Sequence, residues 1–133
     1  MTWHWLELSV VLALHDAQIA EHGGLAGIRD LGLVESALLR PQNLAAYQAM
    51  DAPDLAAAYA FGFARNHGFV DGNKRVAWIS GRLFLRRNGW VLNYQPAEAV
   101  RLMEDLAGGR ITEEDLMAWY RARAHRLNAG GGE

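Results

Sequence analysis

The chain has 133 residues, of which 51% are hydrophobic, so it is long and apolar enough to form one folded domain with its own core. Its net charge of −2 lacks the basic surplus typical of proteins dedicated to nucleic acid, and we expect no direct binding to nucleic acid. Cysteine is absent, which excludes disulfides and thiolate chemistry.

The N-terminal segment, MTWHWLELSVVLAL, predicts neither a signal peptide nor a membrane span. It has no basic leading region, Glu7 interrupts its apolar run, and His15 and Asp16 end that run. We therefore expect a cytoplasmic protein without a membrane partner.

The first third of the chain alternates helical and irregular patterns. Apolar residues at helical spacing predict a helix from about Leu6 to Ala20. The segment LAGIRDLG (25–32) has turn residues and no clear period, which predicts an ordered loop or a short hairpin. A short helix is expected over Leu33–Leu39 and ends before Pro41, whereas residues 42–53 follow no clear pattern.

The middle of the chain predicts three further helices. Asp54 is a candidate N-cap for the helix LAAAYAFGFARN. The run Lys74–Arg87 predicts the next helix, which the pair Asn88-Gly89 ends. Pro96 suits the first position of a third helix, which ends at the glycine pair 108–109.

The C-terminal part predicts one more helix. Thr112 and Asp115, three positions apart, resemble a capping box for a helix that runs to about Leu127. The last residues predict a disordered tail, which we assign to 129–133. Because no repeat or linker is evident, the sequence predicts one all-α domain over residues 1–128.

The helix predicted over 74–87 has apolar side chains on most sides, which is typical of the buried axis of a domain. Arg75, Arg82 and Arg86 share one narrow stripe, and we interpret Arg82 and Arg86 as structural or interfacial residues. The beginning of this helix is then expected to open at the surface or in a cleft.

The stretch HGFVDGNKR at the start of this helix carries the parts of a phosphate-handling site. A helix N-terminus presents unpaired N–H groups and a positive dipole end, Gly72 allows close approach, and Lys74 and Arg75 add positive charge. Asp71 would by itself repel a phosphate, which suggests a bridging divalent metal. His67 is suited to take a proton from an attacking hydroxyl group. Together these residues suit phosphoryl or nucleotidyl transfer.

Each of these residues also has a plainer interpretation. A single histidine before a loop is more often a hydrogen-bonded structural residue, and Asp-Gly-Asn is first of all a turn signal. Lys74 and Arg75 in isolation would be solvated residues at a helix start. Cations oppose the helix dipole at that end, however, so an anion would explain them better.

The same stretch resembles the motif of the Fic/Doc family, H-x-F-x-D/E-G-N-G-R-x-x-R, in the form of its Doc (death-on-curing) branch, where lysine replaces the second glycine. The segments LHDAQIAEHGGLAGIRDLG and LFLRRNG also resemble Doc-type toxins of toxin–antitoxin systems. The resemblance spans most of the chain. It implies a single compact all-α domain in which a central buried helix follows the active-site loop.

The resemblance implies a role for each matching residue. His67 would be the catalytic general base that activates a target hydroxyl group. Asp71 would hold Mg²⁺ against the phosphates of ATP, and Phe69 would anchor the loop in the core. The residues implied to bind the nucleotide phosphates are Gly72, Asn73, Lys74 and Arg75.

Two reactions are open to this family. Doc-type proteins resemble kinases that transfer the γ-phosphate of ATP to a hydroxyl of a translation factor, elongation factor Tu, whereas other Fic proteins transfer AMP to a protein hydroxyl. Lys74 stands where most Fic proteins have glycine, and its side chain would crowd one binding mode of the nucleotide and supply charge to the other, which supports the first reaction. The second motif arginine falls on Trp78, which cannot pair with phosphate, and Arg82 is a weak substitute. We expect a kinase-like toxin that inhibits translation and growth, with AMP transfer as the alternative.

The resemblance also implies a protein partner. The inhibitory-helix pattern S/T-x-x-x-E-G/N of some Fic proteins has no match, because the windows at Ser36 and Thr112 fail at the glutamate. Restraint in trans is then implied, by a Phd-like antitoxin whose disordered tail folds onto the toxin. A second alternative is a non-catalytic, antitoxin-binding co-repressor.

Two further features have open interpretations. The loop GGLAGIRD (23–30) is either a flap that docks the protein substrate or a plain surface turn. Four tryptophans are candidates for an antitoxin groove, although tryptophan at helical spacing more often belongs to the core. These are Trp3, Trp5, Trp90 and Trp119.

Overall fold

The computed structural model describes residues 2–127, so Met1 and the tail expected at 129–133 lie outside the described residues. Within that range the chain forms six helices and two short strands, and the predicted all-α class is confirmed with one small strand pair added. In chain order the elements are α1 (Leu8–His22), α2 (Leu31–Tyr47), α3 (Ala52–Asn66), α4 (Asn73–Arg87), β1 (Trp90–Leu92), α5 (Pro96–Ala107), α6 (Glu113–Arg123) and β2 (Ala124–Arg126). None of the described helices is both long and apolar enough to cross a membrane.

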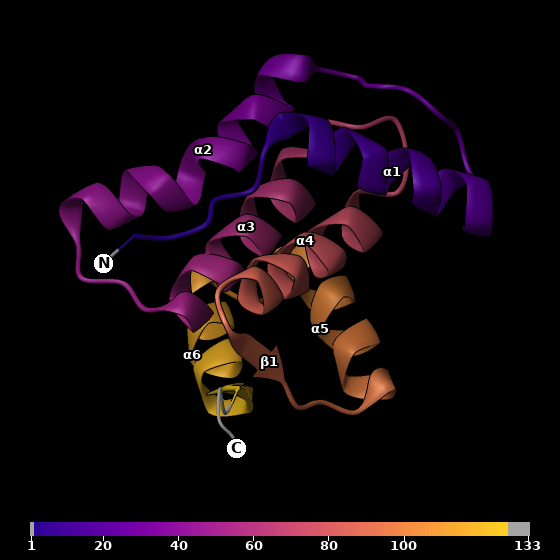
Figure 1. Cartoon of the computed structure of the whole chain (residues 1–133). Coiled ribbons are helices and arrows are strands. Elements are labelled where there is room, and N and C mark those ends of the chain that lie inside the picture. Colours follow the sequence, from indigo (N-terminus) through magenta and orange to yellow (C-terminus); the bar gives the residue numbers. More distant parts are fainter. Residues whose placement is uncertain (1, 128–133) are drawn as a thin grey trace.

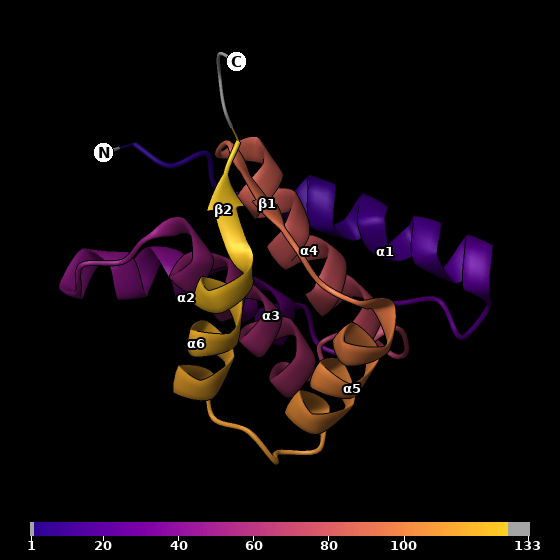
Figure 2. The same ribbon diagram turned by 90° about the horizontal axis from the view of Figure 1, so that it is seen from below.

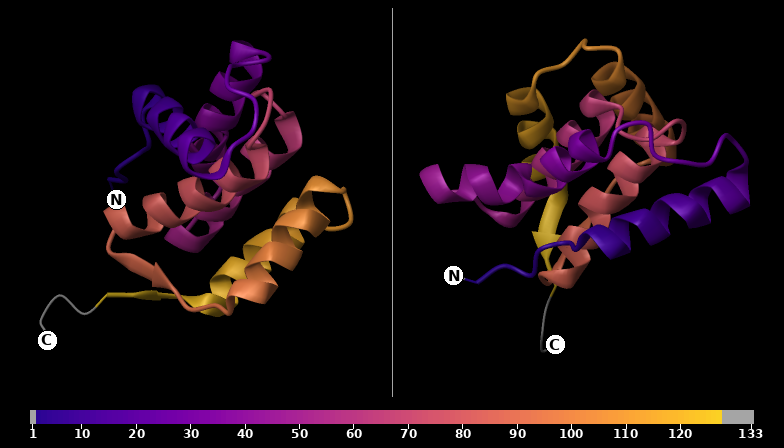
Figure 3. Two further views of the ribbon diagram at one scale, coloured as in Figure 1. Left: turned by 90° about the vertical axis from the view of Figure 1, so that its right-hand side faces the viewer. Right: turned by 90° about the horizontal axis from the view of Figure 1, so that it is seen from above.

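Helices α3 and α4 lie at the centre of the domain (Figure 1). On one side α1 packs against α4 and α2 packs against α3. On the other side α6 packs against α3, and α5 contacts both central helices (Figure 3). The connection between α3 and α4 therefore emerges from the core at one end, where the connection between α1 and α2 lies against it.

Helix α3 is buried along most of its length by the helices packed around it, and its sequence is rich in alanine. Its small side chains allow the neighbouring helices to approach closely, and glycines at two crossings leave no room for a side chain. A methyl group on Gly62 would lie 3.0 Å from both Cα and Cβ of Ala37 in α2. One on Gly81 in α4 would lie 3.0 Å from the carbonyl oxygen of Ala56. Short helices can pack at interior density in this way.

Helix α4 follows the loop, as predicted, and begins at Asn73. It buries one wide face against α1 and α3, whereas the stripe of Arg75, Arg82 and Arg86 is exposed. The helix is therefore central, but α3 is the more completely buried of the two.

The prediction that a helix ends before Pro41 is wrong. Helix α2 runs through Pro41 to Tyr47, and the side chain of Asp30 caps its N-terminus. Proline has no N–H, so the carbonyl of Ala37 loses its helical donor. This part of α2 is buried against α3 at Gly62, and the packing between the two helices outweighs the loss of one helical hydrogen bond.

The prediction that Asp54 is the N-cap of α3 is also wrong. Asp51 is the N-cap residue, and Asp54 lies at the third helical position, where its carboxylate accepts a hydrogen bond from Asp51 N at 3.0 Å. Asp54 also forms an ion pair with Arg121 of α6. Pro53 lies between the two aspartates and belongs to the first turn, where proline fits a helix, so the N-cap residue must precede it.

The last helix ends at Arg123 and not near Leu127, as the sequence pattern predicted. Strand β2 pairs antiparallel with β1 (Figure 2). The paired residues are Trp90 with Arg126, Val91 with His125 and Leu92 with Ala124. Leu127 N extends the contact by donating to Gly89 O at 2.8 Å. Pairing with a distant segment thus replaces the last turn of the expected helix.

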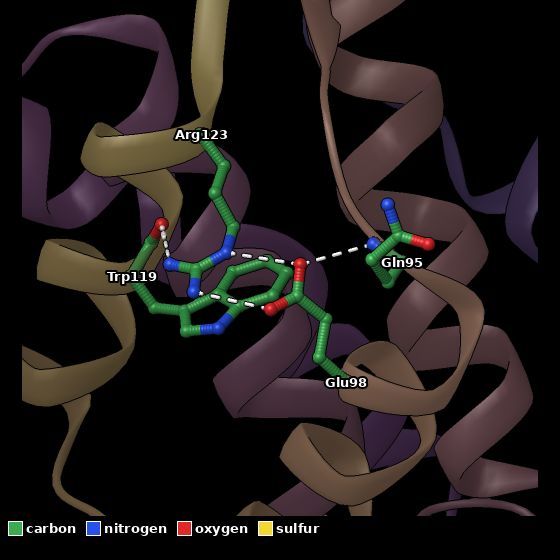
Figure 4. A network of polar contacts seen from close by, with 4 residues as sticks. All are labelled: Gln95, Glu98, Trp119 and Arg123. Carbon is green, nitrogen blue, oxygen red and sulfur yellow. Dashed lines mark hydrogen bonds and ion pairs between the residues drawn. The ribbon is translucent and has the colours of Figure 1, made fainter.

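A polar cluster joins α5 to α6 (Figure 4). Arg123 donates to the two carboxylate oxygens of Glu98 at 3.3 and 3.2 Å and to Trp119 O at 3.3 Å. Its guanidinium carbon lies 4.2 Å from the centre of the Trp119 ring. Glu98 also accepts a hydrogen bond from Gln95 N at 3.0 Å, and the bonds from Arg123 and then from Gln95 lower the pKa of its carboxyl. The cluster therefore ties the start of α5 to the end of α6.

Gly62→Ala tests the close crossing of α2 and α3. We expect the free energy of unfolding, measured with urea, to fall by about 1–3 kcal/mol because the helices must move apart. Gly108→Ala is the control, because a methyl group there would meet the flexible end of the Arg110 side chain. Similar losses in both variants would contradict the role assigned to the crossing.

Tyr59 makes the domain sensitive to alkaline pH. Its side chain is fully buried, its hydroxyl accepts a hydrogen bond from Leu6 N at 3.0 Å, and burial raises its pKa to about 12. Because this exceeds the value of about 10 in an unfolded chain, its contribution to stability is intact below about pH 10 and is lost as the pH rises toward 12.

We expect the titration of Tyr59 to lower the free energy of unfolding by about 3 kcal/mol, as followed by circular dichroism in urea. The buried Tyr120, whose pKa is also raised by burial, adds a separate loss, so Tyr59→Phe should remove the contribution of Tyr59 and leave that of Tyr120. An unchanged profile in Tyr59→Phe would contradict the assignment.

Candidate functional site

A reciprocal pair of hydrogen bonds closes the loop between α3 and α4. Asn73 Oδ1 accepts from Phe69 N at 3.1 Å, and Asn73 Nδ2 donates to Phe69 O at 3.0 Å. The Phe69 side chain is buried, and its ring stacks on that of His15 with centres 3.9 Å apart. The side chain of Asn73 is thus used within the loop, which leaves its backbone N–H as the group that could face an anion.

His15, which the sequence analysis did not select, lies beneath this loop. Its side chain is 2% exposed, and its Nε2 lies 2.8 Å from the carbonyl oxygen of Asp71. A carbonyl oxygen only accepts, so Nε2 carries the hydrogen of this bond. His15 is four positions after the buried Val11 on α1. In the sequence, the feature that could have indicated this role is a histidine at helical spacing from an apolar residue in an apolar helix.

His67 ends α3 in a left-handed backbone conformation, with φ 50° and ψ 48°. This conformation costs a residue other than glycine about 1 kcal/mol, although histidine adopts it more readily than most residues. The side chain is exposed, and the residue lines a pocket. The imidazole of His67 is therefore accessible to a ligand.

The carboxylate of Asp71 is held by backbone N–H groups. Oδ2 accepts from Leu25 N at 3.2 Å, and Oδ1 accepts from Gly72 N at 2.9 Å. These hydrogen bonds, with that from Leu25 first, lower the pKa of the carboxyl, so Asp71 is an exposed anion at neutral pH. Gly24 lies so close that a methyl group there would be 2.8 Å from Asp71 Oδ2.

Asp71 suits a magnesium ion that is shared with a phosphate ligand. Mg²⁺ commonly binds through one or two carboxylates and completes its shell with water and substrate phosphate oxygens. Within residues 2–127 there is no group of three or more His, Cys, Asp or Glu side chains that could hold a metal ion. A metal ion at Asp71 would therefore depend on phosphate and water for its other ligands.

Helix α4 begins without a side-chain cap. Asp30 caps α2 and Thr112 caps α6, whereas the N-cap residue of α4 is Gly72, which has φ 79° and no side chain to accept a hydrogen bond. The first turn, NKRV, instead carries the exposed cations Lys74 and Arg75. Unpaired N–H groups, the helix dipole and two cations together favour an anion at this point.

A pocket of about 910 Å³ opens beside this helix start. One wall comes from His67 and residues 70–75, which include the predicted phosphate and metal positions. Trp78 and Tyr94 also line the pocket, with ring centres 4.9 Å apart and planes at 84°. The opposite wall is formed by Pro96, Ala99, Val100, Met103, Glu104 and Ala107 of α5. This wall was not predicted from the sequence, and it includes the apolar residue Val100, which is 60% exposed.

The loop 23–30 is bonded to the loop between α3 and α4. Gly27 O accepts from Val70 N at 3.1 Å, and Arg29 N donates to Gly68 O at 2.8 Å. All residues of the loop 23–30 are nevertheless exposed. The loop is therefore part of the frame of the site, while the docking of a substrate on it stays a prediction.

Two arginines further along α4 lie away from the helix start. The guanidinium carbon of Arg82 is 5.3 Å from the ring centre of Tyr94 and 5.8 Å from that of Trp78. Arg86 is exposed in the last turn of the helix. Neither is among the described residues that line the pocket, which agrees with the structural or interfacial interpretation.

The four tryptophans considered for an antitoxin groove pack against the core. Trp5 stacks on Phe84 with ring centres 5.7 Å apart, and Trp119 lies under the guanidinium of Arg123. All four are partly buried: Trp3, Trp5, Trp90 and Trp119. This packing favours the core interpretation of these residues.

Comparison with known proteins agrees with the geometry of the site. The family model described as "Fic/DOC family" matches residues 5–85, which is more than half of the chain. The chain is 42% identical to the protein kinase doc of Escherichia phage P1 over 103 residues, which cover 77% of this chain and 81% of the relative. It is also 42% identical to Toxin Doc of Mycolicibacterium smegmatis over 91 residues, which cover 64% of this chain and 68% of the relative. These matches confirm the resemblance to Doc-type toxins, and the chain belongs to the Fic/DOC family.

Proposed function

We propose that this protein is a Doc-like toxin that transfers the γ-phosphate of ATP to a hydroxyl group of a translation factor, elongation factor Tu. The modification would inhibit translation and growth in the cytoplasm. The observation that carries the proposal is the uncapped start of α4, where Lys74 and Arg75 line the same pocket as His67. The relative named protein kinase doc supports phosphoryl transfer.

The proposed phosphate site combines backbone and side-chain charge. The N–H groups in the first turn of α4 and the cations Lys74 and Arg75 bind phosphate oxygens, and Gly72 permits their close approach. Asp71 would hold a Mg²⁺ ion, which would neutralise charge on the phosphates. The apolar wall of α5, with Trp78, is available for the nucleoside.

His67 is the proposed general base. The hydroxyl oxygen of the protein substrate attacks the γ-phosphorus, the bond from that phosphorus to the oxygen bridging the β-phosphate breaks, and ADP leaves. The hydroxyl proton passes to an imidazole nitrogen of His67, which afterwards releases it to solvent. The exposure of His67 at the pocket supports this role.

The second motif position supports phosphoryl transfer over AMP transfer. Trp78 occupies it, and its indole packs edge-on against Tyr94 in the pocket wall. Arg82, one turn further along, lies near the rings of Tyr94 and Trp78 and not at the helix start. The extra positive charge at the helix start comes instead from Lys74, at the position where most Fic proteins have glycine.

The proposed partners are a protein substrate and an antitoxin. Leu25, Ile28 and Val70 are exposed apolar residues, 67%, 42% and 47% exposed, on the two loops of the site, and they suit docking of the translation factor. The toxin name of the second relative supports an antitoxin partner, and the proposed antitoxin is Phd-like and restrains the activity in trans.

Labelled ATP distinguishes phosphoryl transfer from AMP transfer. The purified protein is incubated with elongation factor Tu and with ATP labelled at either the α or the γ position. We expect label on the factor from the γ position only. His67→Ala should lower the rate at least about 100-fold, which is the usual contribution of a general base. His22→Ala, in the last turn of α1, is the control and should leave the rate unchanged.

Label from the α position would contradict phosphoryl transfer and favour AMP transfer. No label from either position, with equal effects of the native protein and His67→Ala on growth, would favour the non-catalytic co-repressor.

Gly24 and Gly27 provide a matched test of Asp71. Their φ values are 113° and 112°, so alanine introduces similar backbone strain at both positions. A methyl group at Gly24 would lie 2.8 Å from Asp71 Oδ2, whereas at Gly27 the nearest atom is Val70 Cγ2 at 3.7 Å. We expect Gly24→Ala to raise the Mg²⁺ concentration for half-maximal activity about tenfold more than Gly27→Ala does. Equal effects in the two variants would show that backbone strain alone is responsible.

A further inference from the structure

Arg29, in the loop 23–30, reaches the C-terminal end of α3. Its Nε donates to the carbonyl of His67 at 2.7 Å, and its Nη2 donates to the carbonyl of Asn66 at 3.2 Å. Its backbone N donates to Gly68 O at 2.8 Å. Three consecutive carbonyl groups at the start of the site loop are therefore held by one residue from a distant part of the chain.

These carbonyls lie where a helix ends, which explains why an arginine is effective there. The last carbonyls of a helix have no intrahelical partners and carry the negative end of the dipole, so a guanidinium group is favourable. Among the described residues, Arg29 takes part in no ion pair, so its charge is directed at the main chain. The planar fork of arginine also suits two adjacent acceptors better than the single ammonium group of lysine does.

The bond to the His67 carbonyl constrains a backbone angle at an unusual residue. The φ of 50° at His67 is rare for residues with a side chain. Rotation about ψ of His67 would move its carbonyl away from Arg29 Nε and turn the following peptide. Gly68 packs closely on α2, because a Cβ there would lie 2.6 Å from Val34 Cγ2, so no residue with a side chain fits at this position. Arg29 and Val34 therefore bound the conformations open to this part of the loop.

We propose that Arg29 is a positioning residue for His67. It fixes the left-handed backbone at the end of α3 and thereby sets the direction in which the imidazole enters the pocket. This inference rests on the proposed function, because the direction matters for phosphoryl transfer only if His67 is the base.

The contacts of Arg29 are separate from those that hold the nucleotide side of the site. Asp71 is held by Leu25 N and Gly72 N, and the loop is closed by Asn73. Loss of the Arg29 side chain should therefore disturb His67 and leave ATP binding intact. We expect an effect on kcat and not on the KM for ATP.

The test compares Arg29→Ala and Arg29→Lys with the native protein and with Arg40→Ala. Arg40 is the matched control, because its guanidinium also bridges two elements, to Glu113 at the start of α6, and does not line the pocket. One readout is nuclear magnetic resonance of the backbone and ring of His67, assigned with His67→Ala. The other is steady-state kinetics of γ-phosphate transfer.

We expect Arg29→Ala to shift the backbone and ring resonances of His67 and to lower kcat about tenfold, with the KM for ATP changed by less than about twofold. Arg29→Lys should recover part of kcat and part of the native shifts. Arg40→Ala should lower the stability of the fold and leave both His67 and kcat unchanged.

Unchanged His67 resonances in Arg29→Ala would overturn the positioning role. That holds even if kcat falls, because Arg29 would then act on the substrate directly. If the native protein transfers no phosphate, the proposed function fails, and the resonances of His67 alone decide whether Arg29 positions it.

Discussion

The site depends on one constraint, which is that an exposed loop must keep its polar main chain in a single conformation. The loop between α3 and α4 has a left-handed residue at each end, His67 and Gly72, and cannot be held by regular secondary structure. Hydrogen bonds from the first part of the chain hold it instead, through the ring of His15, the backbone of Leu25 and the side chain of Arg29. The N-terminal segment is thus part of the site.

The start of α4 shows how the fold accommodates a feature that is unfavourable by itself. A helix that begins with glycine and two cations lacks a cap and opposes its own dipole, which would destabilise it in isolation. Burial of the face from Val76 to Leu85 against α1 and α3 offsets this cost. The unfavourable end is thereby kept available for an anion, because stability comes from the other end and face of the same helix.

The two walls of the pocket have different chemistry and different origins. The polar wall comes from nine consecutive residues, so its chemistry is set by a short stretch of sequence, although the N-terminal segment holds its conformation. The apolar wall belongs to α5, which the contact between Glu98 and Arg123 ties to α6 and the pairing of β1 with β2 supports. The position of α5 therefore depends on the C-terminal part of the chain, although the chemistry of the polar wall does not.

The sequence by itself determined the helices with strong periodicity, the loop HGFVDGNKR and the residues from His67 to Arg75 that line the pocket, because helix capping, turn chemistry and motif order act over a few residues. Only the tertiary structure decided that His15 and Arg29 lie at that loop and that α5 closes the pocket. It also decided that α2 continues through Pro41 and that residues 124–126 form a strand. Each of these results depends on contacts between segments far apart in the chain, where packing and hydrogen bonding outweigh the local preference that a sequence pattern reports.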